Sequence, residues 1–266
     1  MTHRPSRFAT LASTTLLVSS LALLSACGGS SGTAATDTSG TTDTSGTTDT
    51  TTTPTLTPVP TPTPTPVATP DVAGKVFIPT KDTSKGLLIL NVGGNGTAYM
   101  QETGKSAQTA PLTWNLNSAD LTLAFTGSTS SFKVAEDSNT LTMSTDSTNT
   151  FTQAKPLTLA ALNGKHLSFD MTGNPQCTAM TISFNGATAT LRDKCNGKYG
   201  EGTIPVEEVA GAKNLIKLNG GDGYMLLALA SGDLTKGRMI RAEFGGSTLE
   251  GLQANDITTV STPLQP

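Results

Sequence analysis

The chain is poor in the residues from which metal, redox and nucleic-acid sites are usually built. Its 266 residues include 2 histidines, 3 cysteines, 1 tryptophan, 3 tyrosines and 8 phenylalanines. Lys and Arg number 17 against 20 acidic residues, a formal charge of −3 with no basic stripe. That balance excludes the electrostatic footprint of a nucleic-acid-binding protein. The few aromatic rings suffice for a hydrophobic core, which argues against an aromatic surface for carbohydrate.

Histidine is scarce enough to restrict the possible chemistry. His3 lies in an N-terminal segment that we expect to be removed, so His166 is the only remaining imidazole. A zinc site with several histidines is therefore excluded, and a Ser/His/Asp triad would have to use His166. His166 lies in an alternating run typical of a strand, and no nucleophile elbow or phosphate-binding glycine loop accompanies it. We expect no cofactor, no metal and no enzymatic activity.

The N-terminal segment has the three parts of an export signal. Arg4 and Arg7 give a basic start, residues 11–24 are apolar apart from Ser and Thr, and Ser25-Ala26 supplies small residues before a cleavage site. A membrane-spanning helix needs about 20 residues, more than this apolar stretch contains. The pattern favours a signal peptide over residues 1–26 rather than a transmembrane anchor.

The run Leu24-Ser25-Ala26-Cys27 resembles the lipobox of bacterial lipoprotein precursors. This resemblance implies diacylglyceryl transfer to the Cys27 thiol, cleavage before Cys27, and acylation of the new amino group. Two or more acyl chains hold a protein stably on a membrane. Because Gly28 rather than Asp follows Cys27, the resemblance points to the outer membrane. The alternative is an ordinary secretory signal with an unrelated cysteine.

Residues 27–71 are expected to form a disordered stalk. A six-residue Thr/Ser/Gly/Asp repeat begins at Thr36 and again at Thr42, with almost no apolar side chain to bury. Alternating Thr-Pro over residues 54–70 then favours polyproline II at about 3.1 Å per residue, a spacer of roughly 50 Å. The segment either lifts the following domain off the lipid or serves as a linker without a required length.

From residue 72 onward the apolar residues alternate with period two, as in strands with one buried face. Clusters of Gly, Asn, Asp and Ser separate the runs, and no amphipathic helix longer than two turns is evident. We predict an antiparallel all-β fold, either a barrel or a sandwich. The residues expected to share buried faces are Leu112, Trp114 and Leu116; Leu121, Leu123 and Phe125; Phe132 and Val134; Leu141 and Met143; Leu167, Phe169 and Met171; Met180, Ile182 and Phe184; and Ile216 and Leu218.

Two copies of one pattern organise these strands. Gly74-Lys75 and Asn95-Gly96 recur 90 positions later as Gly164-Lys165 and Asn185-Gly186, which predicts duplicated units over residues 72–161 and 162–266. Coincidence is the alternative, because these pairs are common in turns. The order of strands and turns resembles the small lipocalin-like domains of bacterial lipoproteins. It departs from them because the lone Trp114 lies within a unit and not directly after a Gly-Lys pair.

Once Cys27 carries lipid, Cys177 and Cys195 remain as an even pair in an exported chain. A three-residue loop centred on Gly186 would place them opposite one another on paired strands, within disulfide range. We expect a disulfide there, and the competing interpretation is a metal or redox pair.

Neither Glu207-Glu208 nor the turn over residues 219–222 has the ligand spacing of a calcium loop, so both are expected at the solvated surface. Tyr99 and Tyr224 are expected to be packed.

Two classes of function fit this sequence. The first is a non-enzymatic binding module on the outer membrane that recognises a protein, a glycan or a small apolar molecule. The second is a structural or assembly lipoprotein that faces the periplasm. An enzyme that uses His166 is a third and weaker interpretation.

Overall fold

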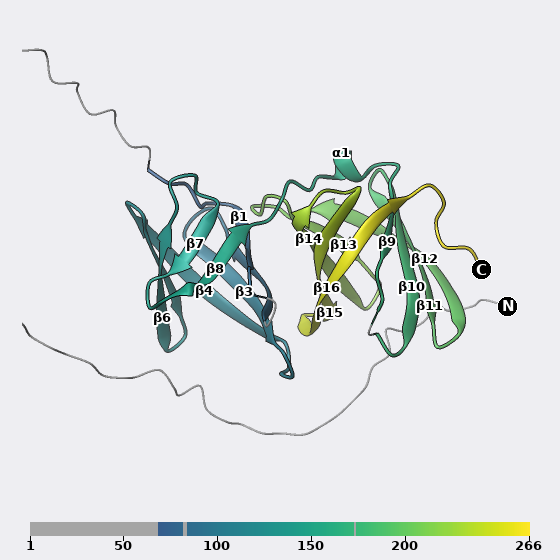
Figure 1. Cartoon of the computed structure of the whole chain (residues 1–266), viewed down its shortest axis with the longest axis horizontal. Coiled ribbons are helices and arrows are strands. Elements are labelled where there is room, and N and C mark those ends of the chain that lie inside the picture. Colours follow the sequence, from purple (N-terminus) through teal and green to yellow (C-terminus); the bar gives the residue numbers. More distant parts are fainter. Residues whose placement is uncertain (1–68, 82–83, 173) are drawn as a thin grey trace, which may run out of the picture. The chain divides into compact units, whose positions relative to one another are not determined.

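The computed structural model describes residues 69–81, 84–172 and 174–266 (Figure 1). The segment expected to be a signal peptide, the expected lipidation residue Cys27 and nearly all of the expected stalk lie outside these described residues. Within the described part, sixteen strands account for almost all regular structure, and the one helix, α1 (Leu159–Leu162), has four residues. The predicted all-β class is therefore confirmed. None of the described residues form a helix with the length and apolar character needed to cross a membrane.

The first eight strands close into an antiparallel barrel, the first barrel. These strands are β1 (Lys75–Pro79), β2 (Ser84–Leu90), β3 (Asn95–Glu102), β4 (Gln108–Asn117), β5 (Asp120–Phe125), β6 (Ser128–Val134), β7 (Thr140–Met143) and β8 (Asp146–Gln153). Each strand pairs with the next one along the chain. The sheet closes because β1 also pairs with β8, with Phe77 opposite Gln153.

The remaining eight strands repeat this arrangement as the second barrel. They are β9 (His166–Phe169), β10 (Cys177–Asn185), β11 (Thr188–Cys195), β12 (Lys198–Glu208), β13 (Ile216–Asn219), β14 (Gly223–Gly232), β15 (Lys236–Gly245) and β16 (Thr248–Val260). Closure again joins the first strand to the last, with Ile257 of β16 opposite Phe169 of β9. The sequence did not decide between a barrel and a sandwich, and the structure shows two tandem barrels.

Alternation of apolar residues builds the interior of each barrel. In the first barrel, the expected partners on β4, β5, β6 and β7 all lie in one apolar cluster. The fully buried members of that cluster are Val72, Phe77, Leu90, Leu121, Leu123 and Leu141. Trp114 points into the same interior, and its Nε1–H donates to the carbonyl oxygens of Asn91 and Asn95 at 3.1 and 2.9 Å. The tryptophan therefore holds the turn between β2 and β3 against this barrel.

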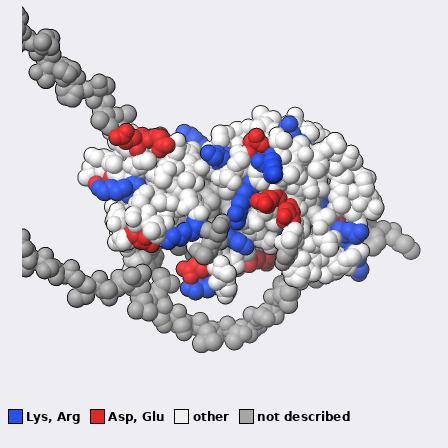
Figure 2. All heavy atoms as spheres, in the orientation of Figure 1, with Lys and Arg blue, Asp and Glu red and all other residues white. Residues whose placement is uncertain are grey.

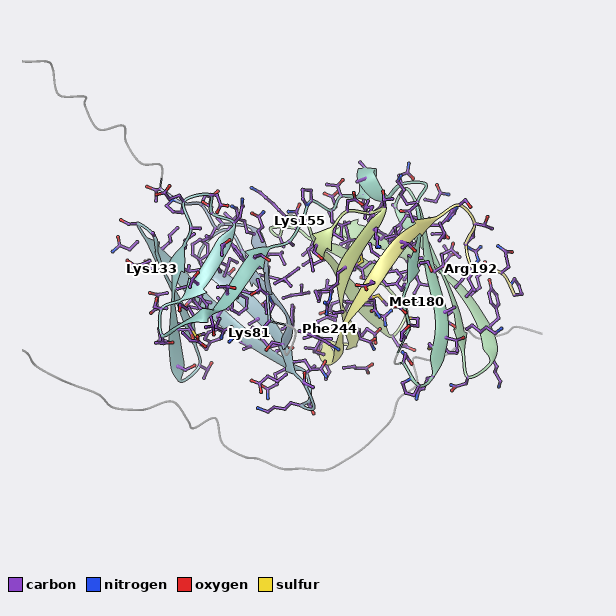
Figure 3. The ribbon with its side chains drawn as sticks, in the orientation of Figure 1. Lys81, Lys133, Lys155, Met180, Arg192 and Phe244 are labelled. Carbon is purple, nitrogen blue, oxygen red and sulfur yellow. A yellow bond between two sulfur atoms is a disulfide. The ribbon has the colours of Figure 1, made fainter. Side chains whose placement is uncertain are left out.

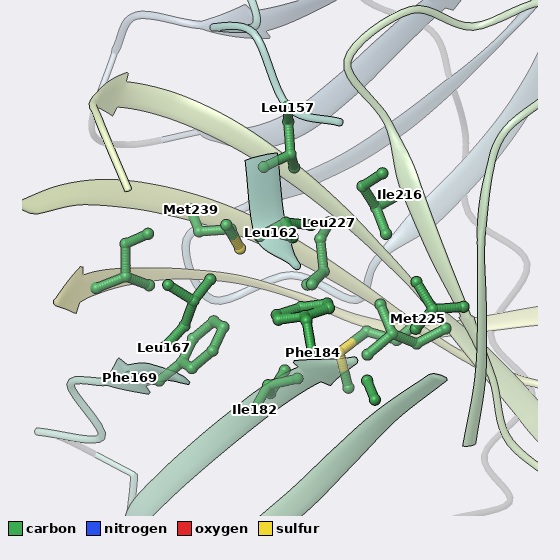
Figure 4. Close-up of a cluster of buried hydrophobic side chains, with 14 of the residues drawn as sticks. Leu157, Leu162, Leu167, Phe169, Ile182, Phe184, Ile216, Met225, Leu227 and Met239 are labelled. Carbon is green, nitrogen blue, oxygen red and sulfur yellow. The ribbon is translucent and has the colours of Figure 1, made fainter. Parts of the chain in front are cut away.

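The second barrel is plugged at one end by α1 and the segment before it. Thr158 caps the helix by accepting a hydrogen bond from the Ala161 amide at 3.2 Å, and Leu162 is fully buried. Leu157 and Leu162 pack on the inward side chains of β9, β10, β13, β14 and β15, as Figure 4 shows. The predicted inward residues Leu167, Phe169, Met171, Met180, Ile182, Phe184, Ile216 and Leu218 all belong to this cluster.

A third apolar cluster, called the seam here, lies between the outer faces of the two barrels. The first barrel contributes Val76 and Ile78 of β1 and Leu87 and Ile89 of β2. The second barrel contributes outward side chains of β14, β15 and β16, among them Leu226, Ala228, Ile240, Ala242, Phe244 and Leu252. These strands are thus buried on both faces. Burial of apolar surface at about 25 cal/mol per Å² makes such a seam a major stabilising contact.

Phe244 is the aromatic centre of the seam (Figure 3). Its ring stacks on Tyr224 with centroids 4.2 Å apart, and it meets Tyr99 of the first barrel edge-on at 5.2 Å. Burial, followed by the neighbouring Tyr224, raises the pKa of Tyr99. Both tyrosines are packed, as predicted.

Hydrogen bonds reinforce the seam. The side-chain Oε1 of Gln101 on β3 accepts a hydrogen bond from the Leu252 amide at 2.9 Å. In the segment that joins the barrels, the Ala154 amide donates to the Val76 carbonyl of the first barrel. The next amide, that of Lys155, donates to the Leu229 carbonyl of the second, each at 2.8 Å. The connection between the barrels is therefore fixed on both sides.

The expected disulfide between Cys177 and Cys195 is present, but the turn was predicted incorrectly. Asn185 pairs with Thr188, so the loop contains only Gly186 and Ala187 rather than three residues. Gly186 has φ +58°, which suits the first loop position of a type II′ turn. A register shift between Cys177 and Ala179 compensates for the missing loop residue and brings the two cysteines opposite one another.

Removal of this disulfide by the double substitution Cys177→Ala and Cys195→Ala should lower the free energy of unfolding by about 3 kcal/mol, because the unfolded chain loses its cross-link. Urea unfolding of the purified chain measures the difference. Reduction of the unsubstituted chain should give a matching loss. Equal urea midpoints with and without the bridge would contradict the prediction.

Truncation of the seam's central ring by Phe244→Ala should lower the free energy of unfolding by about 3 kcal/mol, since it removes a buried ring and leaves a cavity. Calorimetry of the variant tests this. Thr203→Ala, at an exposed outward position of β12, serves as the control and should change stability little. A Phe244→Ala protein as stable as that control would rule out a packed seam.

Candidate functional site

The two ends of the second barrel differ in burial and polarity. At the end closed by α1, inward residues such as Ile216 and Met239 are fully buried. At the opposite end, called the open end here, the inward residues Leu191, Asp193 and Glu243 remain partly exposed. Their inward orientation follows from the register, because Asp193 lies opposite Met180 and Glu243 lies opposite Met225, both core residues. This end of the barrel is the candidate site.

Arg241 lies inside the barrel at the boundary between the apolar core and the open end. It is 2 % exposed and, among the described residues, is the only ionisable one so completely buried. Its Nη1–H donates to the Met180 sulfur at 3.0 Å, and its guanidinium carbon lies 5.9 Å from the centre of the Phe169 ring. The guanidinium therefore extends from β15 across the interior toward β9 and β10.

The guanidinium is poorly satisfied for a buried cation. Its Nε lies 2.8 Å from Oε1 of Glu243, an ion pair, yet this nitrogen has no hydrogen bond of acceptable direction. A thioether sulfur is only a weak acceptor. Burial lowers the pKa of Arg241, and the charge of Glu243 opposes that shift. A buried donor without a good acceptor costs free energy. The Nε–H of Arg241 therefore has the capacity to bind a further hydrogen-bond acceptor.

Two more inward polar side chains of the second barrel have incompletely paired oxygens: Asn255, opposite Met239, and Asp193, opposite Met180. Asn255 is 9 % exposed and donates from Nδ2 to the Asp170 carbonyl at 2.9 Å, while its Oδ1 is buried without a hydrogen bond. Asp193 has no hydrogen-bond or ion-pair partner among the described residues, and burial alone raises the pKa of its carboxyl group. The interior of the second barrel thus contains one donor and two acceptors that are not fully satisfied.

Glycines leave space beside these groups. Gly202 lies opposite the inward Leu191, and Gly251 lies opposite Glu243. A Cβ placed on either glycine would have no other atom within 4 Å. The first barrel differs at its inward glycines. The Met100 side chain occupies the position that a Cβ on Gly86 would need, and the Ile89 backbone and the Leu112 side chain crowd the same position at Gly96.

An ion-paired guanidinium and a partly buried carboxylate are groups that can bind and orient a small polar molecule. Among residues 69–81, 84–172 and 174–266, no group of three or more His, Cys, Asp or Glu side chains could hold a metal ion.

Most of the other residues singled out from the sequence take part in contacts that stabilise the fold. His166 is half-buried on the outer face of β9, where its Nδ1 lies 2.9 Å from the Ser183 hydroxyl. Both members of the Glu207-Glu208 pair are exposed, as predicted. Glu207 pairs with Lys217 at 3.3 Å, and Glu208 accepts a hydrogen bond from the Leu159 amide at 2.9 Å.

The surface of the described part also has two hollows. One, of about 510 Å³, is lined by Gly74 and Val92 of the first barrel and by residues 208–215 of the second. Val92 is 70 % exposed, the one large apolar side chain so exposed among the described residues. A second hollow of about 450 Å³ lies along residues 152–156. On the face shown in Figure 2, basic side chains lie among acidic ones, without a large area of one sign.

The residues of the open end were not identified from the sequence. Met239, Arg241 and Glu243 follow the same period-two alternation as the core residues. This spacing was the one feature of the sequence that could have indicated their inward orientation. A charged residue at such a position normally indicates the solvent face of a strand, so the signal is weak without knowledge of the register.

The comparisons with known proteins add no family to this description. No protein-family model matches the chain, and no curated protein matches it.

The partly buried Asp193 carboxyl should make stability depend on pH. Because burial raises its pKa in the folded state, the folded protein holds this proton more tightly than the unfolded chain does. Stability should therefore fall as the pH rises from the ordinary aspartate pKa through the raised value. Asp193→Asn should be more stable than the parent at neutral pH and lose that advantage below the ordinary aspartate pKa. Urea unfolding at several pH values measures this, and a pH-independent difference would contradict it.

Proposed function

We propose that this protein is a lipid-anchored protein of the bacterial outer membrane whose two-barrel domain is a non-enzymatic binding module. The anchoring part rests on the lipobox-like run Leu24-Ser25-Ala26-Cys27 after a basic and apolar segment. In this proposal residues 1–26 are removed, Cys27 carries the acyl chains, and residues 27–71 form the stalk. The membrane is thus one partner, and nucleic acid is not.

The binding part of the proposal rests on the contrast between the two barrel interiors. A buried cation that lacks a good acceptor is expensive for a purely structural role, since apolar side chains of similar size usually serve a core as well or better. Such a group, inside a barrel that also has an inward, partly buried aspartate and two inward glycines with open space beside them, supports a role in recognition. A periplasm-facing structural or assembly lipoprotein remains the second proposal, because the lipobox supports both orientations equally.

The anchoring proposal is tested by Cys27→Ser. The variant should stay unprocessed by the lipoprotein pathway and leave the membrane fraction, because a serine hydroxyl cannot take the thioether-linked lipid. Fractionation with detection of the C-terminal domain measures this, and Cys177→Ser with Cys195→Ser is the matched control that keeps the lipid. If the Cys27→Ser protein is processed and sediments like the parent, the proposal is wrong.

The orientation is tested by protease treatment of intact cells. A surface-exposed module should be released, because the Thr/Pro-rich stalk offers an accessible chain. Protection in intact cells, with cleavage after the outer membrane is opened, would favour the periplasmic alternative.

A further inference from the structure

We infer that the segment from Asp71 to Lys75, through which the chain enters the first barrel, transmits tension from the N-terminal side to both barrels and keeps β1 in place under load. This segment is called the entry clasp here. The inference rests on the proposed function, because a chain anchored at Cys27 is pulled from its N-terminal side whenever its domain holds a partner. It is carried by contacts of the clasp in three directions.

One contact of the entry clasp points into the first barrel. The Val72 side chain is 1 % exposed and belongs to the interior cluster of that barrel. The Lys75 amide donates to the Val72 carbonyl at 3.2 Å, and the Gly74 amide donates to the Leu90 carbonyl at 2.6 Å. Because Val72 precedes β1, tension from the N-terminal side reaches this side chain first. Its withdrawal is opposed, since it would expose apolar surface to water.

The chain enters the second barrel in the same way. Leu162 is fully buried and precedes Gly164-Lys165 by two residues, which is also the spacing of Val72 before its own Gly-Lys pair. The Lys165 amide donates to the Leu162 carbonyl at 2.8 Å, a bond of the same kind as that in the first barrel. A buried side chain closed by this bond therefore fixes the entry of the chain in both barrels.

A second set of contacts joins the entry clasp to the loop between β6 and β7. The Asp71 amide donates to the Ser138 hydroxyl at 3.0 Å, and Nζ of Lys75 donates to the Ser138 carbonyl at 2.9 Å. Ser138 is 9 % exposed and has φ +59°, a conformation that persists where surrounding contacts hold it. Because β1 pairs only with β2 and β8, these bonds spread tension to strands beyond its own neighbours.

The third contact of the entry clasp is with the second barrel. The Gly74 carbonyl accepts a hydrogen bond from the Lys213 amide at 2.6 Å, in the loop between β12 and β13. A Cβ on Gly74 would lie 3.3 Å from the Gly211 carbonyl oxygen, so the two backbones are in close contact. Tension on the clasp therefore acts on both barrels.

The pairing of β1 opposes the same movement. This strand has β2 on one side and β8 on the other, so it has no free edge. A strand at the edge of an open sheet can separate from one neighbour, whereas closure of a barrel removes such edges. Withdrawal of β1 toward the N-terminal side must therefore break two ladders as well as the contacts of the clasp.

The test is single-molecule force spectroscopy of the full chain, purified in detergent without lipid on Cys27. The chain is held through a C-terminal tag and through the Cys27 thiol, which is free because the other two cysteines form the disulfide. Lys75→Met removes the bond from Nζ to the Ser138 carbonyl, and Val72→Ala removes most of the buried side chain. At equal force, each should raise the rate of the first unfolding event at least fivefold.

Lys133→Met is the matched control, because Lys133 is an exposed lysine of β6 that pairs with Asp120 of β5 (Figure 3). Its unfolding rate should stay within twofold of the parent's. A second attachment separates the clasp from a general loss of stability. Thr203→Cys combined with Cys27→Ser applies the load between residue 203 and the C-terminus, a path that does not include the clasp. Under that load Lys75→Met and Val72→Ala should unfold at the rate of the parent.

Equal unfolding rates of Lys75→Met and Lys133→Met under load at Cys27 would overturn the inference. An increase of the same size under both loads would overturn it as well. If circular dichroism shows that Val72→Ala does not fold, Lys75→Met decides the question alone.

The anchoring proposal is read separately by fractionation of Cys27→Ser. A chain that is anchored as proposed, but whose unfolding under load is unchanged by Lys75→Met, would lose only the clasp. A chain that is not anchored at Cys27 would lose the proposed source of tension, while the force measurements would still show the clasp.

Discussion

The apolar seam between the barrels is the contact on which the rest of the described structure depends. A closed barrel needs only its inner face to be apolar, yet β1, β2, β14 and β15 bury side chains on both faces. On β15 the two roles alternate residue by residue, so that Ile240 and Ala242 enter the seam while Arg241 points inward. The packing that joins the barrels therefore also fixes the strand that positions the candidate site.

The two barrels share one topology but use their interiors differently. In the first, Met100 fills the space at Gly86 and the interior cluster is apolar. In the second, α1 seals one end with leucine, while a buried guanidinium and a partly buried carboxylate, unpaired among the described residues, lie farther from α1. Transfer of a charged group into a barrel is costly unless its partners compensate fully. The incompletely compensated charge in the second barrel, which has no counterpart in the apolar interior of the first, is the basis for the proposal that the second barrel binds a ligand.

The local pattern of the sequence was enough to predict the class of fold and most of the core. Period-two alternation correctly placed residues such as Leu121, Ile182 and Phe184 inside, because a strand in a barrel has one buried face. The cysteine pairing was also correct, although the turn was wrong. A two-residue loop and a register shift near Cys177 cancel each other, and neither is encoded in the spacing of the cysteines.

The seam and the open end required the tertiary structure. The uninterrupted apolar run Leu87–Leu90 and the similar run that begins at Met225 indicate strands buried on both faces, but a run of this kind does not reveal its partner. Arg241 was not recognised because its inward orientation depends on the register of β14 and β15, and charged residues in strands usually face solvent.

The central claim is that the seam makes the two barrels one cooperative body that holds β15 in place. Native-state hydrogen exchange of the full chain tests it most directly, because exchange free energies separate local from global opening. The account predicts that the amides of β1 and β2 and those of β14 and β15 exchange with the same, highest free energy. A clearly lower exchange free energy for β14 and β15, with the first barrel still protected, would contradict it.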